Sequence, residues 1–259
     1  MMSKEWNKTL TFLSMAHAKL SPSAAKIWMA CPGMPPLLSS MNVEYKVGIP
    51  AATGTLVHEM VETLLKGRLN NLTLEEYYLD STHHIDDFDI TVDKEMIDCA
   101  HVYVDYIKRR SEELNVKRPL IEERVNMVEI HDQLWGTADA ILIGENIIEV
   151  VDLKAGKWAV EPDSPQLKIY ALGALSRYGN AECTVQMTIV QPRGWHKDGI
   201  IRSYSTSAAN LVDWAYETLK PAAEACFEEI PTYNYSKDGC RWCNAKDVCE
   251  TYKLNQKGE

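Results

Sequence analysis

The sequence has no run of about 18 apolar residues, the length that a membrane-spanning helix needs. Its first residues, MMSKEWNKTLTFLSMAHAKL, lack the apolar core and the small-residue cleavage site of a secretion signal. We therefore expect a cytoplasmic protein without a membrane partner. A reducing cytosol disfavours disulfides, so its seven cysteines are better candidates for a metal site.

Internal repeats and long low-complexity linkers are also lacking. With 259 residues, of which 46% are hydrophobic, the chain can bury one sizeable core. We expect a single domain over residues 1–259.

An excess of basic residues is absent as well: 27 Lys and Arg stand against 37 Asp and Glu, a net charge of −10. This balance argues against a general polyanion binder, because nucleic-acid affinity comes largely from neutralised phosphates. The acidic stretch at 80–95 is expected to be a solvated loop. Any DNA contact must come from local groups, and the candidates are Lys108, Arg109 and Arg110, with Arg193, Trp195 and Lys197 as a second patch.

Hydrophobic periodicity predicts helices and strands in alternation. Helices are expected at 21–30 with Ser21 as its cap, at 52–69, at 94–114, at 164–178 and at roughly 207–228. Strands are expected within 119–130, 135–143, 147–153, 181–190 and 199–207, with a hairpin turn at 144–146. This order indicates an α/β fold with a central mixed β-sheet flanked by helices.

The hairpin turn at 144–146 places two carboxylates at the same end of neighbouring strands. Asp139 and Asp152 lie about six residues on either side of the turn, and Lys154 shares a strand face with Asp152. Two carboxylates in contact repel each other, and a hard divalent cation such as Mg²⁺ or Mn²⁺ relieves this repulsion. The alternative is a surface Asp–Lys pair at a strand end, because Asp-x-Lys alone is common.

The order of several polar residues resembles the nuclease motifs of the PD-(D/E)xK superfamily, in its RecB-like branch. That branch has a helical His, an Asp after a Gly, an (Asp/Glu)-x-Lys and a Gln-x-x-x-Tyr, in this order along the chain. This sequence has a matching residue at every place: His58 in GTLVHE, Asp139 in GTAD, Asp152 and Lys154 in DLK, and Gln166 and Tyr170 in QLKIY.

The resemblance implies a restriction-endonuclease-like core over residues 54–205 and a metal-dependent deoxyribonuclease. It implies that Mg²⁺ or Mn²⁺ is held by His58, Asp139, Asp152 and the carbonyl of Leu153. Lys154 would then assist the attacking water, while Gln166 and Tyr170 face the site.

We expect an exonuclease that acts on single-stranded DNA or free ends in recombination, repair or DNA processing. The alternative is a catalytically silent module that serves a recombinase, annealing protein or helicase as a DNA-binding or scaffold partner.

Three cysteines in CRWCNAKDVC, namely Cys240, Cys243 and Cys249, have a C-x2-C-x5-C spacing. Cys31 follows a predicted helix in an irregular setting and is the candidate for a fourth ligand. The other three cysteines lie in apolar segments, where buried thiols are common. Zinc and a [4Fe–4S] cluster both accept four cysteines, and the spacing does not choose between them.

This layout is similar to RecB-like nucleases of the AddB type and to the CRISPR-adaptation exonuclease, in which one Cys precedes and three follow the nuclease motifs. The resemblance implies a [4Fe–4S] cluster, with Zn²⁺ as the alternative, bound by segments 17–35 and 236–252. The chain also resembles a phage-encoded family of RecB-like proteins. A phage origin would place it in the cytoplasm of a bacterial host.

Overall fold

Five strands form the central sheet in the order β3-β4-β5-β6-β7. The β5–β6 pair is parallel and the other three pairs are antiparallel, so the sheet is mixed, as predicted. The computed structural model describes residues 18–41 and 48–256; the predicted domain, 1–259, and the predicted element at 17–35 extend beyond these ranges. The strand bounds are β3 Leu120–Asn126, β4 Trp135–Ile143, β5 Ile147–Leu153, β6 Thr184–Val190 and β7 Ile201–Ser207.

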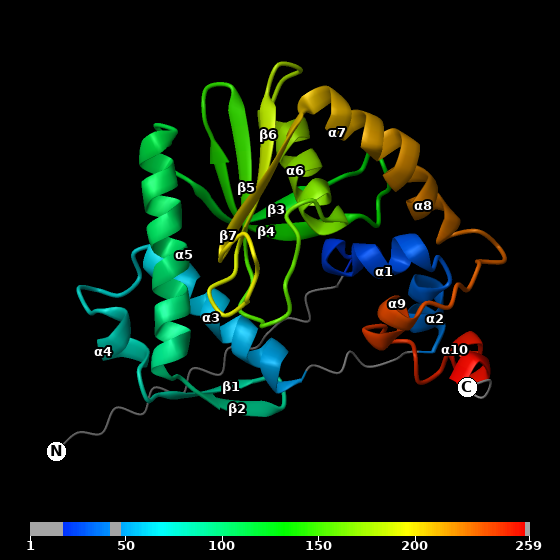
Figure 1. Ribbon diagram of the computed structural model, residues 1–259, viewed down its shortest axis with the longest axis horizontal. Coiled ribbons are helices and arrows are strands. Elements are labelled where there is room, and N and C mark those ends of the chain that lie inside the picture. The colour runs from blue at the N-terminus through cyan, green and yellow to red at the C-terminus, as the bar shows by residue number, and fades with distance from the viewer. Residues whose placement is uncertain (1–17, 42–47, 257–259) are drawn as a thin grey trace.

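Helices cover both faces of this sheet (Figure 1). On one face, α3 and α5 bury their apolar sides against Leu142 and Val151; on the other, α6 and α1 pack with Ile148 and Val150. The α/β class with a flanked mixed sheet is thereby confirmed. The helix bounds are η1 Pro22–Ala24, α1 Ala25–Ala30, α2 Met34–Ser40, α3 Ile49–Leu65, α4 Leu74–Tyr78, α5 Lys94–Glu113, α6 Pro165–Tyr178, α7 Ala208–Trp214, η2 Ala215–Leu219, α8 Lys220–Ala225, α9 Lys237–Arg241 and α10 Glu250–Gln256.

β5 is the central strand, and its sequence IIEVVDL is apolar on both faces because helices cover both. All its residues except Ile147 are buried. Glu149 and Asp152 are therefore charged side chains inside the protein, and they lie on opposite faces of the strand. Glu149 faces α5, where Tyr106 and Arg110 hold it, and Asp152 faces α6.

Helices α5 and α6 begin at capping residues. Asp93 accepts a hydrogen bond from Met96 N at the start of α5, and Ser164 accepts one from Leu167 N at the start of α6. Each bond satisfies a backbone donor that the first helical turn leaves free. Pro165 occupies the first position of α6, where its missing N–H costs nothing.

Two details in the first hundred residues differ from the sequence expectations. Ser21 makes no capping bond, because its hydroxyl pairs with that of Ser23. The stretch at 80–95 contains a hairpin, β1 Thr82–Ile85 and β2 Phe88–Thr91, in place of the expected loop. Asp86 adopts a φ of 52°, which suits a tight turn between paired strands.

The predicted helix at 207–228 ends at Ala225 and is not uniform. Its middle segment, η2, is a π-helix that ends two residues before Pro221. Proline lacks an N–H and clashes with the carbonyl four residues earlier, and a wider π turn relieves both effects.

No helix in the ranges 18–41 and 48–256 has the length and apolar character required to cross a lipid bilayer.

Candidate active site

Asp139 occupies the point where strands β4 and β5 separate. The ladder between them runs from Ile143↔Ile148 to Ala140↔Val151 and stops there. Beyond it, Leu153 N donates a hydrogen bond of 2.7 Å to Asp139 Oδ2. The carboxylate thus replaces the missing ladder partner, and it lies beside Asp152 as the hairpin count predicts.

His58 joins these residues from helix α3. Its Nε2 lies 3.1 Å from the carbonyl oxygen of Leu153 and 3.3 Å from Asp139 Oδ2. Both neighbours are acceptors, so Nε2 carries a proton in this arrangement. Three predicted ligands, His58, Asp139 and the Leu153 carbonyl, therefore lie within contact distance, although 95 residues separate His58 from Leu153.

Lys154 and the α6 residues form a second network next to the first. Lys154 Nζ lies 2.8 Å from Asp152 Oδ2 and donates to Gln166 Oε1 at 3.0 Å. Gln166 Nε2 in turn donates to Asp152 Oδ1 at 3.3 Å and to the Tyr170 hydroxyl at 3.5 Å. The Gln166 amide thereby bridges the acid and the base of the Asp-x-Lys pair.

The environment of the pair shifts both of its pKa values. The pKa of Asp152 is raised to about 6. Burial is the main cause and the charge of Asp139 contributes, while Lys154 and His58 act in the opposite direction. Burial acts to lower the pKa of Lys154, but Asp152 and Asp139 outweigh it and the net shift is upward. Lys154 is therefore a cation at neutral pH, suited to donate hydrogen bonds and not to accept a proton.

The donor types around Asp152 suit a hard divalent cation. Asp152 is only 2% exposed, and its carboxylate lies 2.8 Å from the Lys154 ammonium and accepts a hydrogen bond from Gln166 Nε2. Carboxylates, a carbonyl and an imidazole are ligands that Mg²⁺ or Mn²⁺ accepts. The ligands are not gathered around one point, since within the described ranges no three His, Cys, Asp or Glu side chains form a ready metal site.

The structure explains why the GTAD motif begins with a glycine, Gly136. A Cβ at this position would lie 2.8 Å from Pro22 Cγ and 2.9 Å from Cε1 of Tyr170. Strand β4 thus approaches the Tyr170 ring and the η1 turn too closely for any side chain.

We expect Gly136→Ala to lower the free energy of unfolding by about 1–3 kcal/mol, because the added methyl displaces Tyr170 or Pro22. Urea denaturation measures the change. Gly54→Ala is the control, since a Cβ there meets no atom within 4 Å and lies on helix α3. Equal stability of the two variants would contradict this steric account.

Glu122 is a residue of the site that the sequence did not reveal. It lies in β3 with a φ of 54°, at the point where the β3–β4 ladder skips the position of Asp139. Its pKa is raised to about 8, chiefly by burial and then by the charges of Asp139 and Glu62, against the nearby Lys66. The charge of Asp152 also contributes. Only the register of β3 on β4 would have placed Glu122 beside Asp139, and the sequence does not fix that register.

Glu122→Gln is expected to stabilise the protein at pH 8. A carboxyl with a raised pKa holds its proton more tightly in the folded state, so stability falls as pH rises from about 4.5 to about 8. Glutamine has no charge and removes that loss. Melting temperatures across this pH range should decline less for Glu122→Gln than for the unsubstituted protein, with the exposed Glu129→Gln as control. Parallel curves would refute the burial of an ionisable Glu122.

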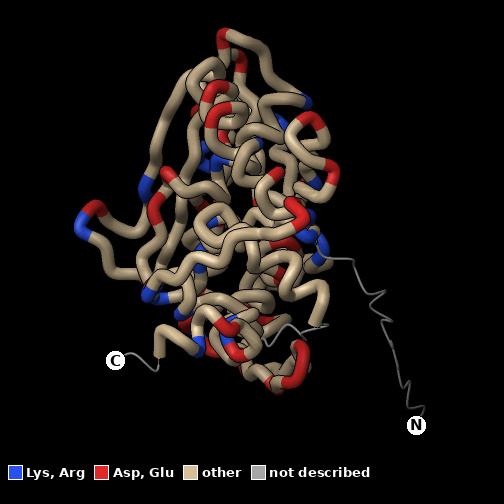
Figure 2. Tube along the Cα trace, turned by 90° about the vertical axis from the view of Figure 1, so that its right-hand side faces the viewer, with Lys and Arg blue, Asp and Glu red and all other residues tan. Residues whose placement is uncertain are grey.

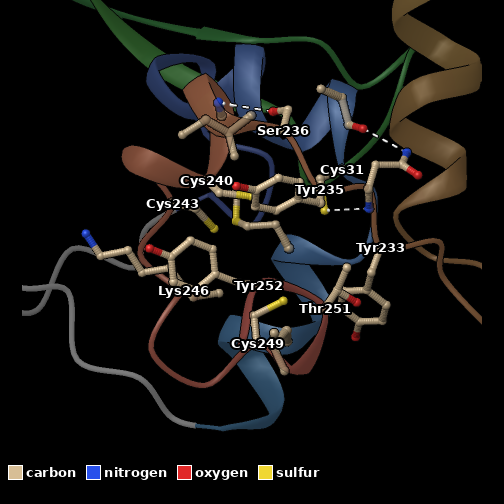
Figure 3. Close-up of a pocket in the computed structure, with 17 residues that line it drawn as sticks. Cys31, Tyr233, Tyr235, Ser236, Cys240, Cys243, Lys246, Cys249, Thr251 and Tyr252 are labelled. Atoms are coloured by element: carbon tan, nitrogen blue, oxygen red, sulfur yellow. Dashed lines mark hydrogen bonds between the residues drawn. The ribbon is translucent and has the colours of Figure 1, made fainter. Parts of the chain in front are cut away.

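The four predicted cluster cysteines line one cavity between the two ends of the chain (Figure 3). Cys31 follows α1, Cys240 lies in α9, and Cys243 and Cys249 lie in the loop before α10. Burial raises the pKa of both the Cys31 and Cys243 thiols, and the neighbouring thiols raise them further. The cavity has a volume of about 30 Å³, and its other walls include Ile27, Met34 and Tyr252.

Backbone contacts hold the two ends together around this cavity. Gly33 N donates to Thr232 O at 2.8 Å, and Asn234 N donates to Cys31 Sγ at 3.4 Å. Asn234 Nδ2 also donates to Ala30 O at 2.9 Å. In the ribbon, α1 and α2 lie beside α9 and α10 (Figure 1). The remaining cysteines, Cys99, Cys183 and Cys226, are buried and do not line the cavity.

The predicted DNA-contact residues differ in their availability. Lys108, Arg109, Trp195 and Lys197 are exposed. Arg110 is not available, because its Nε donates to the buried Glu149 at 2.6 Å and compensates that charge. Arg193 is paired with Glu95 at 3.0 Å. In the view of Figure 2, acidic and basic residues are interleaved along the coloured part of the chain.

Three solved structures are similar to this chain at TM-scores below 0.5, so we infer function from the residues of this chain alone. A crystal structure described as a "putative exonuclease" from Eubacterium rectale has a TM-score of 0.48 and 11% identity, covering 98% of this chain and 94% of that chain. A protein named SSO0001 has a TM-score of 0.31 and 14% identity, covering 87% and 96%. Protein VC1899 from Vibrio cholerae has a TM-score of 0.29 and 9% identity, covering 78% and 57%.

A family described as "Protein of unknown function (DUF2800)" matches residues 17–258, nearly the whole sequence. The chain belongs to this family.

Proposed function

We propose that this protein is a metal-dependent DNA nuclease of the PD-(D/E)xK type. One observation carries the proposal: residues from all four predicted motifs meet in two adjoining contact networks. His58 from α3 and Asp139 from β4 meet at Leu153, and Asp152 from β5 meets Lys154 and Gln166 from α6. A surface Asp–Lys pair would not bury its carboxylate or share a histidine and a glutamine.

The metal would be held by His58, Asp139, Asp152 and the Leu153 carbonyl. The chemistry supplied by Mg²⁺ or Mn²⁺, when bound, is polarisation of the scissile phosphate and a lower pKa of a coordinated water. His58 Nε2 would give up its proton to act as a ligand, because metals bind the neutral imidazole nitrogen.

The chain supplies the remaining steps through Lys154 and Gln166. The Lys154 ammonium donates hydrogen bonds to the attacking water or to the phosphoryl oxygens, whose charge grows during attack. Gln166 fixes the ammonium beside Asp152, so Lys154 needs little reorganisation when DNA binds. Tyr170, joined to Gln166, limits the rotation of the amide.

We propose exonuclease action on single-stranded DNA or free ends, in phage recombination or repair with a recombinase, annealing protein or helicase as partner. Digestion of end-labelled linear DNA with Mn²⁺ tests the activity, and a circular single strand of the same sequence tests the need for an end. Cleavage of the circle would make the enzyme an endonuclease. Failure to cut either DNA with Mg²⁺ or Mn²⁺ would favour the catalytically silent module.

We further propose that Cys31, Cys240, Cys243 and Cys249 bind a metal centre. The resemblance to AddB-type nucleases favours [4Fe–4S], and Zn²⁺ is the alternative, because four cysteine thiolates can hold either one. An absorption spectrum of anaerobically purified protein, with iron, sulfide and zinc analysis, decides between them. Protein that carries neither metal would refute the proposal.

A further inference from the structure

Two exposed tryptophans and an arginine form a stack. Trp158 comes from the loop after Lys154, and Arg241 and Trp242 come from the segment between Cys240 and Cys243. The Arg241 guanidinium lies 5.1 Å from the ring centres of both Trp158 and Trp242. The two rings are 6.4 Å apart, edge to face. Trp158 is 68% exposed and Trp242 is 57% exposed. Large aromatic rings are normally buried, so two in one exposed cluster indicate a binding surface.

Buried polar residues hold the loop that presents Trp158. Gln191 is fully buried, and its Nε2 donates to the Gly156 carbonyl at 2.9 Å and to the Trp158 carbonyl at 2.7 Å. Arg202, 5% exposed, donates to Gln191 Oε1 at 2.6 Å and to Val160 O at 2.8 Å. The ring of Trp158 is thus exposed on a rigid backbone, which lowers the entropic cost of stacking a ligand on it.

Each tryptophan of the stack lines a cleft of the surface. Trp158 lines a cleft of about 540 Å³ with Lys157, Arg193 and Thr53, and this cleft begins at the loop after Lys154. Trp242 lines a second cleft of about 410 Å³ with Lys19 and Asn244. Asp89 and Asp93 also line the first cleft and Arg193 is paired with Glu95, so a phosphate chain would follow the side of Lys157. The stack therefore borders both clefts, and its Trp158 is four residues downstream of Lys154 in the chain.

We propose that Trp158, Arg241 and Trp242 form a stacking platform for the bases of single-stranded DNA, which they guide toward Lys154. This inference rests on the proposed nuclease function. Unpaired bases expose the faces that stack on aromatic rings, whereas a duplex covers these faces with neighbouring bases. The arginine adds a cation for the phosphates or a planar group for stacking. Arg241 and Trp242 lie between Cys240 and Cys243, so a metal held by these cysteines would fix the position of this side of the platform.

Binding in the absence of cleavage tests the platform. The probe is fluorescein-labelled oligo(dT) of about 20 nucleotides, titrated by anisotropy with the Lys154→Ala protein. Adding Trp158→Ala or Trp242→Ala to this protein should weaken binding about tenfold, and binding of a blunt duplex should not change. Tyr216→Ala is the matched control. Tyr216 lies in η2, away from the platform, and its ring is 52% exposed with the Lys220 ammonium over it, so it offers a similar aromatic–cation pair.

Each outcome separates the platform from the nuclease. Unchanged oligo(dT) affinity in both tryptophan variants, or equal loss in Tyr216→Ala, overturns the platform. Mn²⁺-dependent digestion by protein with Lys154 intact tests the nuclease separately. Tryptophan-dependent binding without any digestion would support the platform and refute the nuclease, and digestion with unaltered binding would do the reverse.

Discussion

Lys154→Ala is expected to lower the rate of DNA cleavage by about 10²–10³-fold or more. The lysine is the cation of the proposed site, with its Nζ 2.8 Å from Asp152 and 3.0 Å from Gln166. Its raised pKa keeps it charged at neutral pH, so alanine removes a positive charge from the place where negative charge develops. Initial rates on end-labelled DNA with Mn²⁺ measure the loss, and Asp152→Ala should lose activity as well.

The control for this loss is Lys168→Ala on the same region of the chain. Lys168 is partly buried and pairs with Asp163 at 2.5 Å, but it makes no contact with the Asp152 network. Circular dichroism must show that both variants fold, since Lys154→Ala leaves the buried Asp152 without its nearest cation. A folded Lys154→Ala protein that digests DNA at the normal rate would remove Lys154 from the mechanism.

The local half of the site could be predicted from the sequence. Asp139 and Asp152 flank a short turn, and a hairpin of this length fixes which residues lie opposite each other. Strand parity places Glu149 and Asp152 on opposite faces, which agrees with their contacts to Arg110 and Gln166. Ser164 caps α6, and the helical spacing then places Gln166 and Tyr170 on one side.

The distant half could not be obtained from local rules. His58 reaches Leu153 across 95 residues, and only the resemblance to known nucleases brought it into the site. Glu122 depends on the register of β3 on β4, which no short turn sets, because residues 127–134 separate the strands. Arg110 has the pattern of a DNA-contacting basic residue, yet it compensates the buried Glu149. Such pairings depend on the packing of distant segments, which composition does not encode.

Cys240→Ala is expected to abolish metal binding at the cysteine cavity and to lower the melting temperature markedly. Structural metal sites with cysteine ligands contribute on the order of 10 kcal/mol to folding in small domains, and removal of one ligand loses much of this. Here the centre would link α1 to α9, more than two hundred residues later along the chain. Thermal denaturation and metal analysis of the purified variant measure both effects.

Cys99→Ala is the matched control, because Cys99 is buried in α5 and does not line the cavity. Its variant should keep the metal and lose only the packing of one sulfur. Limited proteolysis adds a local test: loss of the centre should free the segment from Ile230 to Gln256, which the Gly33–Thr232 and Asn234–Ala30 bonds otherwise hold. The sheet is built from residues 120–207, so it should remain protected. If Cys240→Ala kept its metal, Cys240 would not be a ligand. If the variant lost its metal but kept its protease resistance, those backbone bonds alone would hold the C-terminal segment against α1.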